Sequence, residues 1–149
     1  MIKKSKAEWK DNLTKPKPPP LKITAIKEGY IHFRFDHFDA EHSFFEDSVF
    51  TPDWAKKLLK RLKTFQQCTI HQFQKDRSFK QSQYVHEIKW DAANLGSFGI
   101  YKGEEYDLDA WQFGLSKAKG RIHGFFIGDF FYIVWLDPEH RLFEYKKPN

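Results

Sequence analysis

The stretch from Gly120 to Tyr145, GRIHGFFIGDFFYIVWLDPEHRLFEY, constrains the fold of this chain more than any other segment. Its residues alternate over 121–127, and the run over 130–136 is apolar at nearly every position. Alternation with a period of two is typical of a strand, and a run apolar on both faces is typical of a central strand. Gly128 and Asp129 separate the two runs, and glycine first fits a type II′ turn. The segment predicts two antiparallel strands joined by a two-residue hairpin.

Neighbouring segments extend this hairpin into a sheet. Residues 111–116 are expected to form the preceding strand, because their apolar residues share one face. The RLFEY sequence at 141–145 is expected to form a short last strand after the DPEH turn. Residues 21–38 predict an N-terminal hairpin that turns at KEG, and a short strand is expected within 84–89. The sheet is thus predicted as a C-terminal meander of three to four strands plus an N-terminal hairpin.

The segment after Phe50 carries the clearest helix signal. Thr51 is a suitable N-cap, Pro52 suits the first helical position, and Asp53 suits the positive end of the helix dipole. Large apolar residues then recur at helical spacing and form one stripe: Trp54, Leu58, Leu59, Leu62 and Phe65. Together these patterns predict an α+β fold in which an antiparallel sheet packs against one long helix.

Length and composition indicate one domain with a basic extension. The chain has 149 residues, the size of one ordinary domain. Residues 1–20 are rich in lysine and proline and are expected to form a mobile arm, whereas residues 21–149 are expected to form a single α+β domain. Cys68 is the only cysteine, which excludes a disulfide framework.

The charge of the chain indicates its class of partner. The formal net charge is +5, and a basic balance favours nucleic acid or an acidic protein as a partner. No apolar run is long enough to cross a membrane, and the N-terminus lacks the apolar core of a secretory signal. We therefore expect a cytoplasmic protein that does not bind membranes, with nucleic acid such as RNA or an acidic protein as its partner. The oligomeric state cannot be predicted from the sequence.

Two candidate sites are less favoured than structural roles. A metal site could be built from the cluster His32, Asp36, His37, Asp39 and His42, but Arg34 stands between two of its members on one strand face. A polar strand face that continues into a surface loop is the preferred interpretation. Cys68 lies at the negative end of the predicted helix, which does not activate a thiol, so a buried structural cysteine is preferred. The sequence predicts no metal and no cofactor.

A third candidate site combines histidine and arginine near the C-terminus. Arg121 and His123 lie two residues apart on one strand side, and His140, Arg141 and Tyr145 follow the next turn. Such a set suits cleavage of a phosphodiester, in which a base deprotonates the ribose 2′-hydroxyl, an acid protonates the leaving oxygen and cations stabilise the phosphorane. Further basic residues are candidates for RNA binding: Lys117, Lys119, Lys57 and Arg61. The structural alternative is a solvated basic sheet face.

The segment from Ala110 to Tyr145 resembles the C-terminal half of the RelE/ParE toxin superfamily. The resemblance covers about the last 40 residues and is carried by Trp111, Gly120, Arg121, Ile122, His140, Arg141 and Tyr145. The helix over 52–68 is also similar to the family's second helix, which packs on the sheet. The resemblance implies a small bacterial toxin of a toxin–antitoxin pair. Its ribonuclease members cut mRNA without a metal, usually on the ribosome, whereas its gyrase-poisoning members are not nucleases.

The resemblance also implies roles for individual residues. Arg121 would hold phosphate, Arg141 would stabilise charge, and Tyr145 or His140 would transfer protons. The predicted function is a metal-independent endoribonuclease that cleaves mRNA and is held by an acidic antitoxin. The alternative is a non-catalytic basic module that binds nucleic acid or an acidic protein.

The orientation of the strand over 121–127 decides whether Arg121 and His123 can contact a substrate. If Ile122 packs on the helix stripe, Arg121 and His123 point outward to solvent on the other strand side. Gly124 would then lie beneath the helix and allow it to approach closely.

Overall fold

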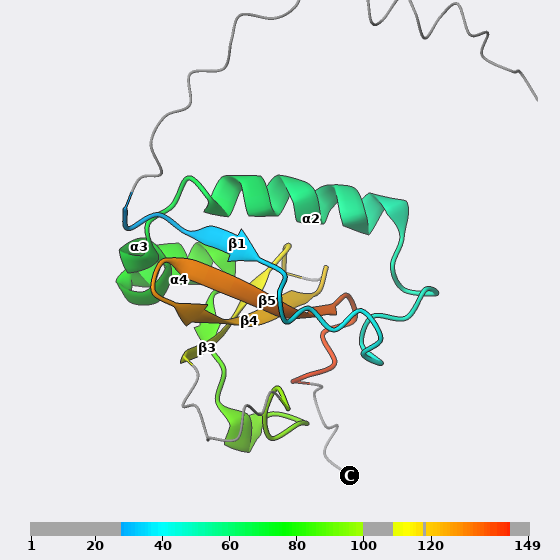
Figure 1. The fold of residues 1–149 in the computed structure, drawn as a ribbon. Coiled ribbons are helices and arrows are strands. Elements are labelled where there is room, and N and C mark those ends of the chain that lie inside the picture. The colour runs from blue at the N-terminus through cyan, green and yellow to red at the C-terminus, as the bar shows by residue number, and fades with distance from the viewer. Residues whose placement is uncertain (1–27, 100–108, 118, 144–149) are drawn as a thin grey trace, which may run out of the picture.

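The structure, a computed structural model, describes residues 28–99, 109–117 and 119–143. They form an α+β fold in which helix α2 lies across one face of a sheet (Figure 1). The helices are α2 (Pro52–Phe65), α3 (Ile70–Lys75) and α4 (Arg77–Gln83), with a 3₁₀ turn at Trp90–Ala92. The strands are β1 (His32–Arg34), β2 (His86–Glu87), β3 (Asp109–Gly114), β4 (Arg121–Ile127) and β5 (Phe130–Asp137).

The sheet has five strands in the order β1-β5-β4-β3-β2. Strands β2 to β5 pair antiparallel, as the sequence predicts for β3, β4 and β5. Ile127 pairs with Phe130 across the two-residue turn, and Gly128 has a φ of +57°, which confirms the predicted hairpin. A positive φ at the first loop position is the conformation that glycine adopts without strain.

Both ends of the predicted sheet differ from the sequence prediction. Strand β1 pairs parallel with β5, so the sheet is mixed, and residues 21–27 of the predicted N-terminal hairpin lie outside the described residues. Residues 141–143 form a turn rather than a last strand, because the Asp137 carboxylate accepts the backbone N–H groups of Arg141 and Leu142. Residues 144–145 and the arm over 1–20 also lie outside the described part of the chain.

The long helix forms as predicted, but two short helices follow it. Thr51 caps α2 and accepts the backbone N–H of Trp54. Thr69 and Gln72 form a capping box at the start of α3, and Asp76 caps α4. The predicted long helix is therefore present, but the described residues contain three helices rather than one. None of these helices has the length and apolar composition needed to cross a membrane.

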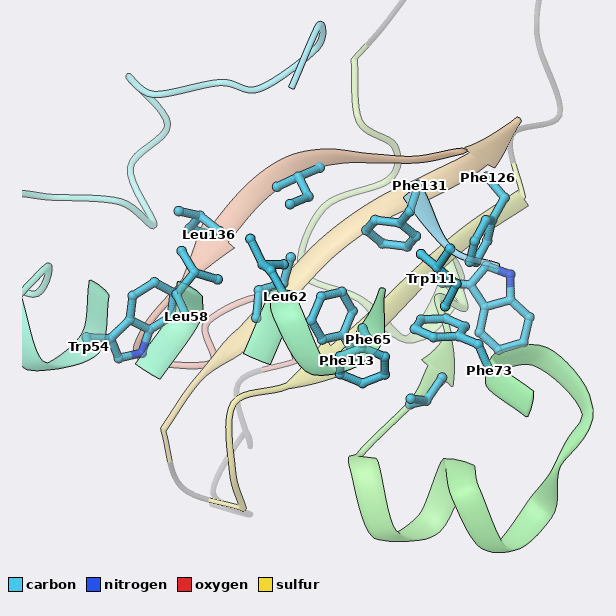
Figure 2. Packing of buried hydrophobic residues seen from close by; sticks show 14 residues of the cluster. Trp54, Leu58, Leu62, Phe65, Phe73, Trp111, Phe113, Phe126, Phe131 and Leu136 are labelled. Carbon is cyan, nitrogen blue, oxygen red and sulfur yellow. The ribbon is translucent and has the colours of Figure 1, made fainter. Parts of the chain in front are cut away.

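The larger core cluster lies between the helices and the sheet (Figure 2). Helix α2 contributes Trp54, Leu58, Leu62 and Phe65, while Ile122 of β4 is fully buried against them, as predicted. Leu59 is 67% exposed, so its place in the predicted stripe was wrong. One residue along a helix rotates a side chain by about 100°, which takes Leu59 away from the face of Leu58.

The opposite face of the sheet is also covered by apolar residues. A second core cluster contains Phe44, Ile88, Phe98, Ala110, Phe125, Val134, Trp135 and Leu142. The β4–β5 pairing shifts register between His123 and Gly124, which places both Val134 and Trp135 on this face. A Cβ on Gly124 would lie 2.6 Å from the Phe131 ring of β5. The absence of a side chain at Gly124 therefore allows close approach of β5, and not of α2 as the sequence predicts.

Candidate functional site

A row of aligned residues crosses the sheet on the face opposite α2. Register partners place His86, Gln112, His123 and Trp135 side by side on β2, β3, β4 and β5. Arg121 and Asp137 are also register partners, two residues further along β4 and β5. Residues two apart on a strand share a face, so this second pair lies beside the row. The strands therefore gather histidine, arginine and aspartate at one end of the sheet.

Asp137 is the centre of this group. Its Oδ2 atom lies 3.0 Å from His123 Nε2, and both side chains are fully buried. Its carboxylate also accepts the backbone N–H groups of Arg141, at 2.7 Å, and Leu142, at 2.9 Å. Burial opposes ionisation of Asp137, but the His123 contact and these two N–H groups outweigh it and hold the pKa of Asp137 below its usual value. Burial lowers the pKa of His123, against the opposing effect of Asp137, so a neutral imidazole donates to the carboxylate.

The prediction that Arg121 and His123 face solvent was wrong. Arg121 is only 8% exposed, and its Nη1 atom donates to the backbone carbonyls of Ser116 and Gly120, each at 2.9 Å. Its guanidinium also lies 5.3 Å from the Tyr84 ring centroid. The second core cluster covers this face, so the strand side opposite α2 is not a solvent face. Burial lowers the pKa of Arg121, while Tyr84 and Asp137 oppose that effect.

His140 and Arg141 lie at the edge of the buried group and remain partly exposed. His140 has a φ of +57° in the turn that Asp137 organises. Burial and then the Arg121 charge lower the pKa of His140, whereas Asp137 opposes them. Arg141 Nη1 donates to the Ser43 carbonyl at 3.0 Å. Four of the five predicted catalytic residues thus meet around Asp137, while Tyr145 lies outside the described residues.

Sequence reasoning missed two members of this group. Asp137 was not among the predicted catalytic residues, because its long-range contacts leave no local pattern. His42 stacks on Trp135, with ring centroids 4.4 Å apart, although 93 positions separate them in the chain (135 − 42). The sequence singled out His42 only as part of a possible metal cluster, which is a different role.

The members of that possible metal cluster are held apart by other contacts. Asp36 accepts from Arg34 at 2.7 Å, and His37 packs against the rings of Phe125 and Tyr132. Within the described residues, no group of three or more histidine, cysteine, aspartate or glutamate side chains is arranged to hold a metal ion. Cys68 is partly exposed rather than buried as predicted, and the burial of part of its surface raises the pKa of its thiol.

Three of the four predicted RNA-binding residues line a basic hollow beside α2. This hollow, of about 380 Å³, is lined by Lys57, Lys60, Arg61, Thr64, Leu115, Ser116 and Lys119. Lys117, which is exposed, does not line it. Arg61 is half-buried, and it donates to the carbonyls of Gly114 and Gln83, so it joins α2 to β3 and α4. Lys57 pairs with Asp53 at 2.9 Å, so Lys60 and Lys119 are the lysines of the hollow that have no ion pair among the described residues.

The basic hollow adjoins the buried group through one residue. Ser116 lines the hollow, and its carbonyl accepts from Arg121.

No family model matches this chain, and no curated protein or solved structure matches it. The function therefore has to be inferred from the chemistry of these residues.

Proposed function

We propose that this protein is a metal-independent endoribonuclease of the RelE/ParE toxin type that cleaves mRNA. The observation that carries the proposal is the position of His140 and Arg141, partly exposed beside the buried His123–Asp137 pair. In the proposed reaction a neutral histidine accepts the proton of the 2′-hydroxyl as the 2′-oxygen attacks phosphorus, and a permanently charged arginine stabilises the phosphorane. The P–O5′ bond then breaks and the 5′-oxygen takes its proton from water.

His140 is the general base of the proposed reaction. Burial keeps its pKa below the ordinary histidine value, so its imidazole is neutral at pH 7 and can accept a proton. No other described residue is hydrogen-bonded to its ring, which leaves the ring nitrogens available to the ribose 2′-hydroxyl. Its left-handed backbone conformation, held by the Asp137 turn, fixes where this ring lies.

Arg141 stabilises the charge that develops on the phosphate. One of its nitrogens is held by the Ser43 carbonyl, and the guanidinium side chain remains partly exposed. Guanidinium groups bind phosphate oxygens through paired hydrogen bonds. The buried Arg121 contributes positive charge without touching the substrate, because its exposed fraction is 8%.

Asp137 and His123 act as positioning residues rather than catalytic ones. The Asp137 carboxylate binds the backbone of Arg141 and Leu142, so it sets the conformation of the turn that carries His140 and Arg141. His123 in turn fixes Asp137 from within the core. This role replaces direct contact between His123 and the substrate, which its complete burial excludes in this conformation.

The basic hollow favours a second candidate function. Lys57, Lys60 and Lys119 can bind the phosphates of RNA, or the carboxylates of an acidic antitoxin, without any chemistry. In that case the His140 turn is a structural element and the protein is a non-catalytic interaction module in the cytoplasm of a bacterial cell.

The two functions are separated by incubating the purified protein with mRNA and with translating ribosomes in EDTA. We expect cleavage by the wild-type protein, with a loss of about 100-fold or more in His140→Ala and Arg141→Ala, typical for loss of an acid–base or charge-stabilising group. His71→Ala is the matched control, because His71 is an exposed histidine on α3. RNA that is bound but remains intact would reject the nuclease and favour the interaction module.

A further inference from the structure

His42 approaches the His140 and Arg141 site from a distant part of the sequence. Its ring stacks on Trp135 at an interplanar angle of 28° and meets the edge of Phe44, with both centroid distances at 4.4 Å. The segment is anchored because the Asp39 N–H donates to the Val134 carbonyl, in the bulge of β5, at 2.9 Å. Two aromatic rings and one backbone bond therefore fix the position of a partly exposed histidine.

The same segment also binds Arg141. The Ser43 carbonyl, next to His42 in the chain, accepts from Arg141 Nη1 at 3.0 Å. The Arg141 guanidinium carbon lies 5.8 Å from the centroid of the Phe44 ring, which also contacts His42. His42 and Arg141 are thus neighbours on one partly exposed surface, although they lie far apart in the sequence.

A backbone hydrogen bond determines which nitrogen of His42 carries its proton. The Phe44 N–H donates to His42 Nδ1 at 3.3 Å, so Nδ1 is an acceptor and the proton of the neutral ring lies on Nε2. Burial lowers the pKa of His42, against opposing effects of Asp39 and Asp137, which also favours the neutral ring. No described residue accepts from Nε2, so the Nε2–H group is a donor without a protein partner in the described part of the chain.

We propose that His42 contacts the RNA by donating its Nε2–H to a phosphodiester oxygen beside Arg141. The inference rests on the proposed ribonuclease function and adds a residue to that site. The proton stays on the His42 ring throughout, since Nδ1 is occupied by the Phe44 N–H and Nε2 has no free lone pair. Proton transfer remains the task of His140, whereas His42 and Arg141 together hold the phosphate.

Two substitutions separate this role from a structural one. In His42→Asn, the amide oxygen replaces Nδ1 as acceptor for the Phe44 N–H, but the distal donor is removed. In His42→Gln, the amide nitrogen lies near the former Nε2 position and retains a donor, whereas the Nδ1 acceptor is removed. We expect His42→Asn to lose about 100-fold in cleavage rate, the usual effect of removing one donor to a developing charge, and His42→Gln to stay within about tenfold of wild type.

The pH profile and the folding stability complete the test. Both variants should keep the pH dependence of the wild-type rate, because His42 transfers no proton. A purely structural His42 would make His42→Asn the more stable and more active variant, and that order would overturn the proposal. Full activity of His42→Asn, or an equal loss in both variants, would overturn it as well.

Failure of the nuclease proposal can be distinguished from failure of the His42 proposal. If the wild-type protein leaves RNA intact, the proposed function fails, but its affinity for single-stranded RNA still reports the His42 contact. In that case we expect His42→Asn to weaken binding and His42→Gln to preserve it. Equal Kd values for wild type and His42→Asn would reject the contact itself.

Discussion

His123 Nε2 and Asp137 Oδ2 form a fully buried contact of 3.0 Å between neighbouring strands. The same carboxylate ends β5 and accepts two backbone N–H groups of the turn that follows. The core of the protein is therefore connected directly to the turn that carries His140 and Arg141. This connection makes the stability of the fold and the geometry of the candidate site depend on one side chain.

Replacement of Asp137 by alanine should destabilise the protein by about 3–5 kcal/mol, the usual cost of breaking a buried charged pair. The change leaves His123 and the N–H groups of Arg141 and Leu142 without their acceptor. Urea unfolding measures the effect. Asp36→Ala is the control, because its pair with Arg34 is exposed and its loss should leave the midpoint unchanged. Equal midpoints for Asp137→Ala and wild type would show that the carboxylate does not support the fold.

Stability should fall as the pH drops below about 6.5, the ordinary histidine pKa. The pKa values of His42, His123 and His140 are lowered in the folded state, so the unfolded chain binds more protons in this range. Stability then rises with pH until the unfolded histidines are neutral. The depressed pKa of Asp137 adds a further loss below about pH 4, where the unfolded carboxylate becomes protonated.

Urea midpoints at pH 7.5 and pH 5.5 measure the histidine effect, and His123→Gln isolates the buried ring. One proton accounts for at most about 1.4 kcal/mol per pH unit, so His123→Gln should flatten the pH dependence by no more than this. An unchanged slope in His123→Gln would mean that the buried ring does not resist protonation.

Gly124→Ala should destabilise the protein by about 3 kcal/mol or more, because overpacking at this position moves backbone as well as side chains. The added Cβ would overlap the Tyr132 carbonyl and lie 2.6 Å from the Phe131 ring. Gly96→Ala is the control, since its added Cβ would have no atom within 4 Å. Thermal unfolding compares the two variants, and similar melting temperatures would contradict the close approach of β5.

Substitution of the lysines in the basic hollow should weaken RNA binding and reduce its salt dependence. Alanine at Lys57, Lys60 or Lys119 removes one cation from the phosphates, which should lower the slope of log K against log salt by about 0.7 for single-stranded RNA. Lys63→Ala is the matched control, because Lys63 lies on the same helix but does not line the hollow. Binding isotherms at several salt concentrations give the slopes. If the slope of log K against log salt is the same in wild type and in all four lysine variants, RNA does not bind at the basic hollow.

Local signals in the sequence predicted the helices and strands, but they did not predict which apolar residues cover each face of the sheet. The Gly128-Asp129 turn predicted the β4–β5 hairpin, and Thr51 with Pro52 predicted the start of α2, because turns and caps depend on adjacent residues. The capping box of Thr69 and Gln72 was a comparable signal for α3 that the sequence interpretation missed.

The burial of Arg121 and His123 depends on residues far away in the chain. Alternation shows that two strand faces differ, but it does not show that a second apolar layer covers the polar one. Here that layer includes Phe44, Phe98 and Leu142, which come from three separate segments. For the same reason, the sequence predicted that His140, Arg141 and Arg121 share one site but did not predict that His42 lies beside them.

The parallel pairing of β1 with β5 has a consequence for synthesis of the protein. Arg141 and Ser43, which join the two sides of the candidate site, are 98 positions apart in the chain. Chains are made from the N-terminus, so His42 and β1 leave the ribosome long before their partners exist outside it. The site can assemble only after the turn at 137–142 has emerged from the exit tunnel. Until then the Ser43 carbonyl has no Arg141 side chain to accept from, and the candidate site is incomplete.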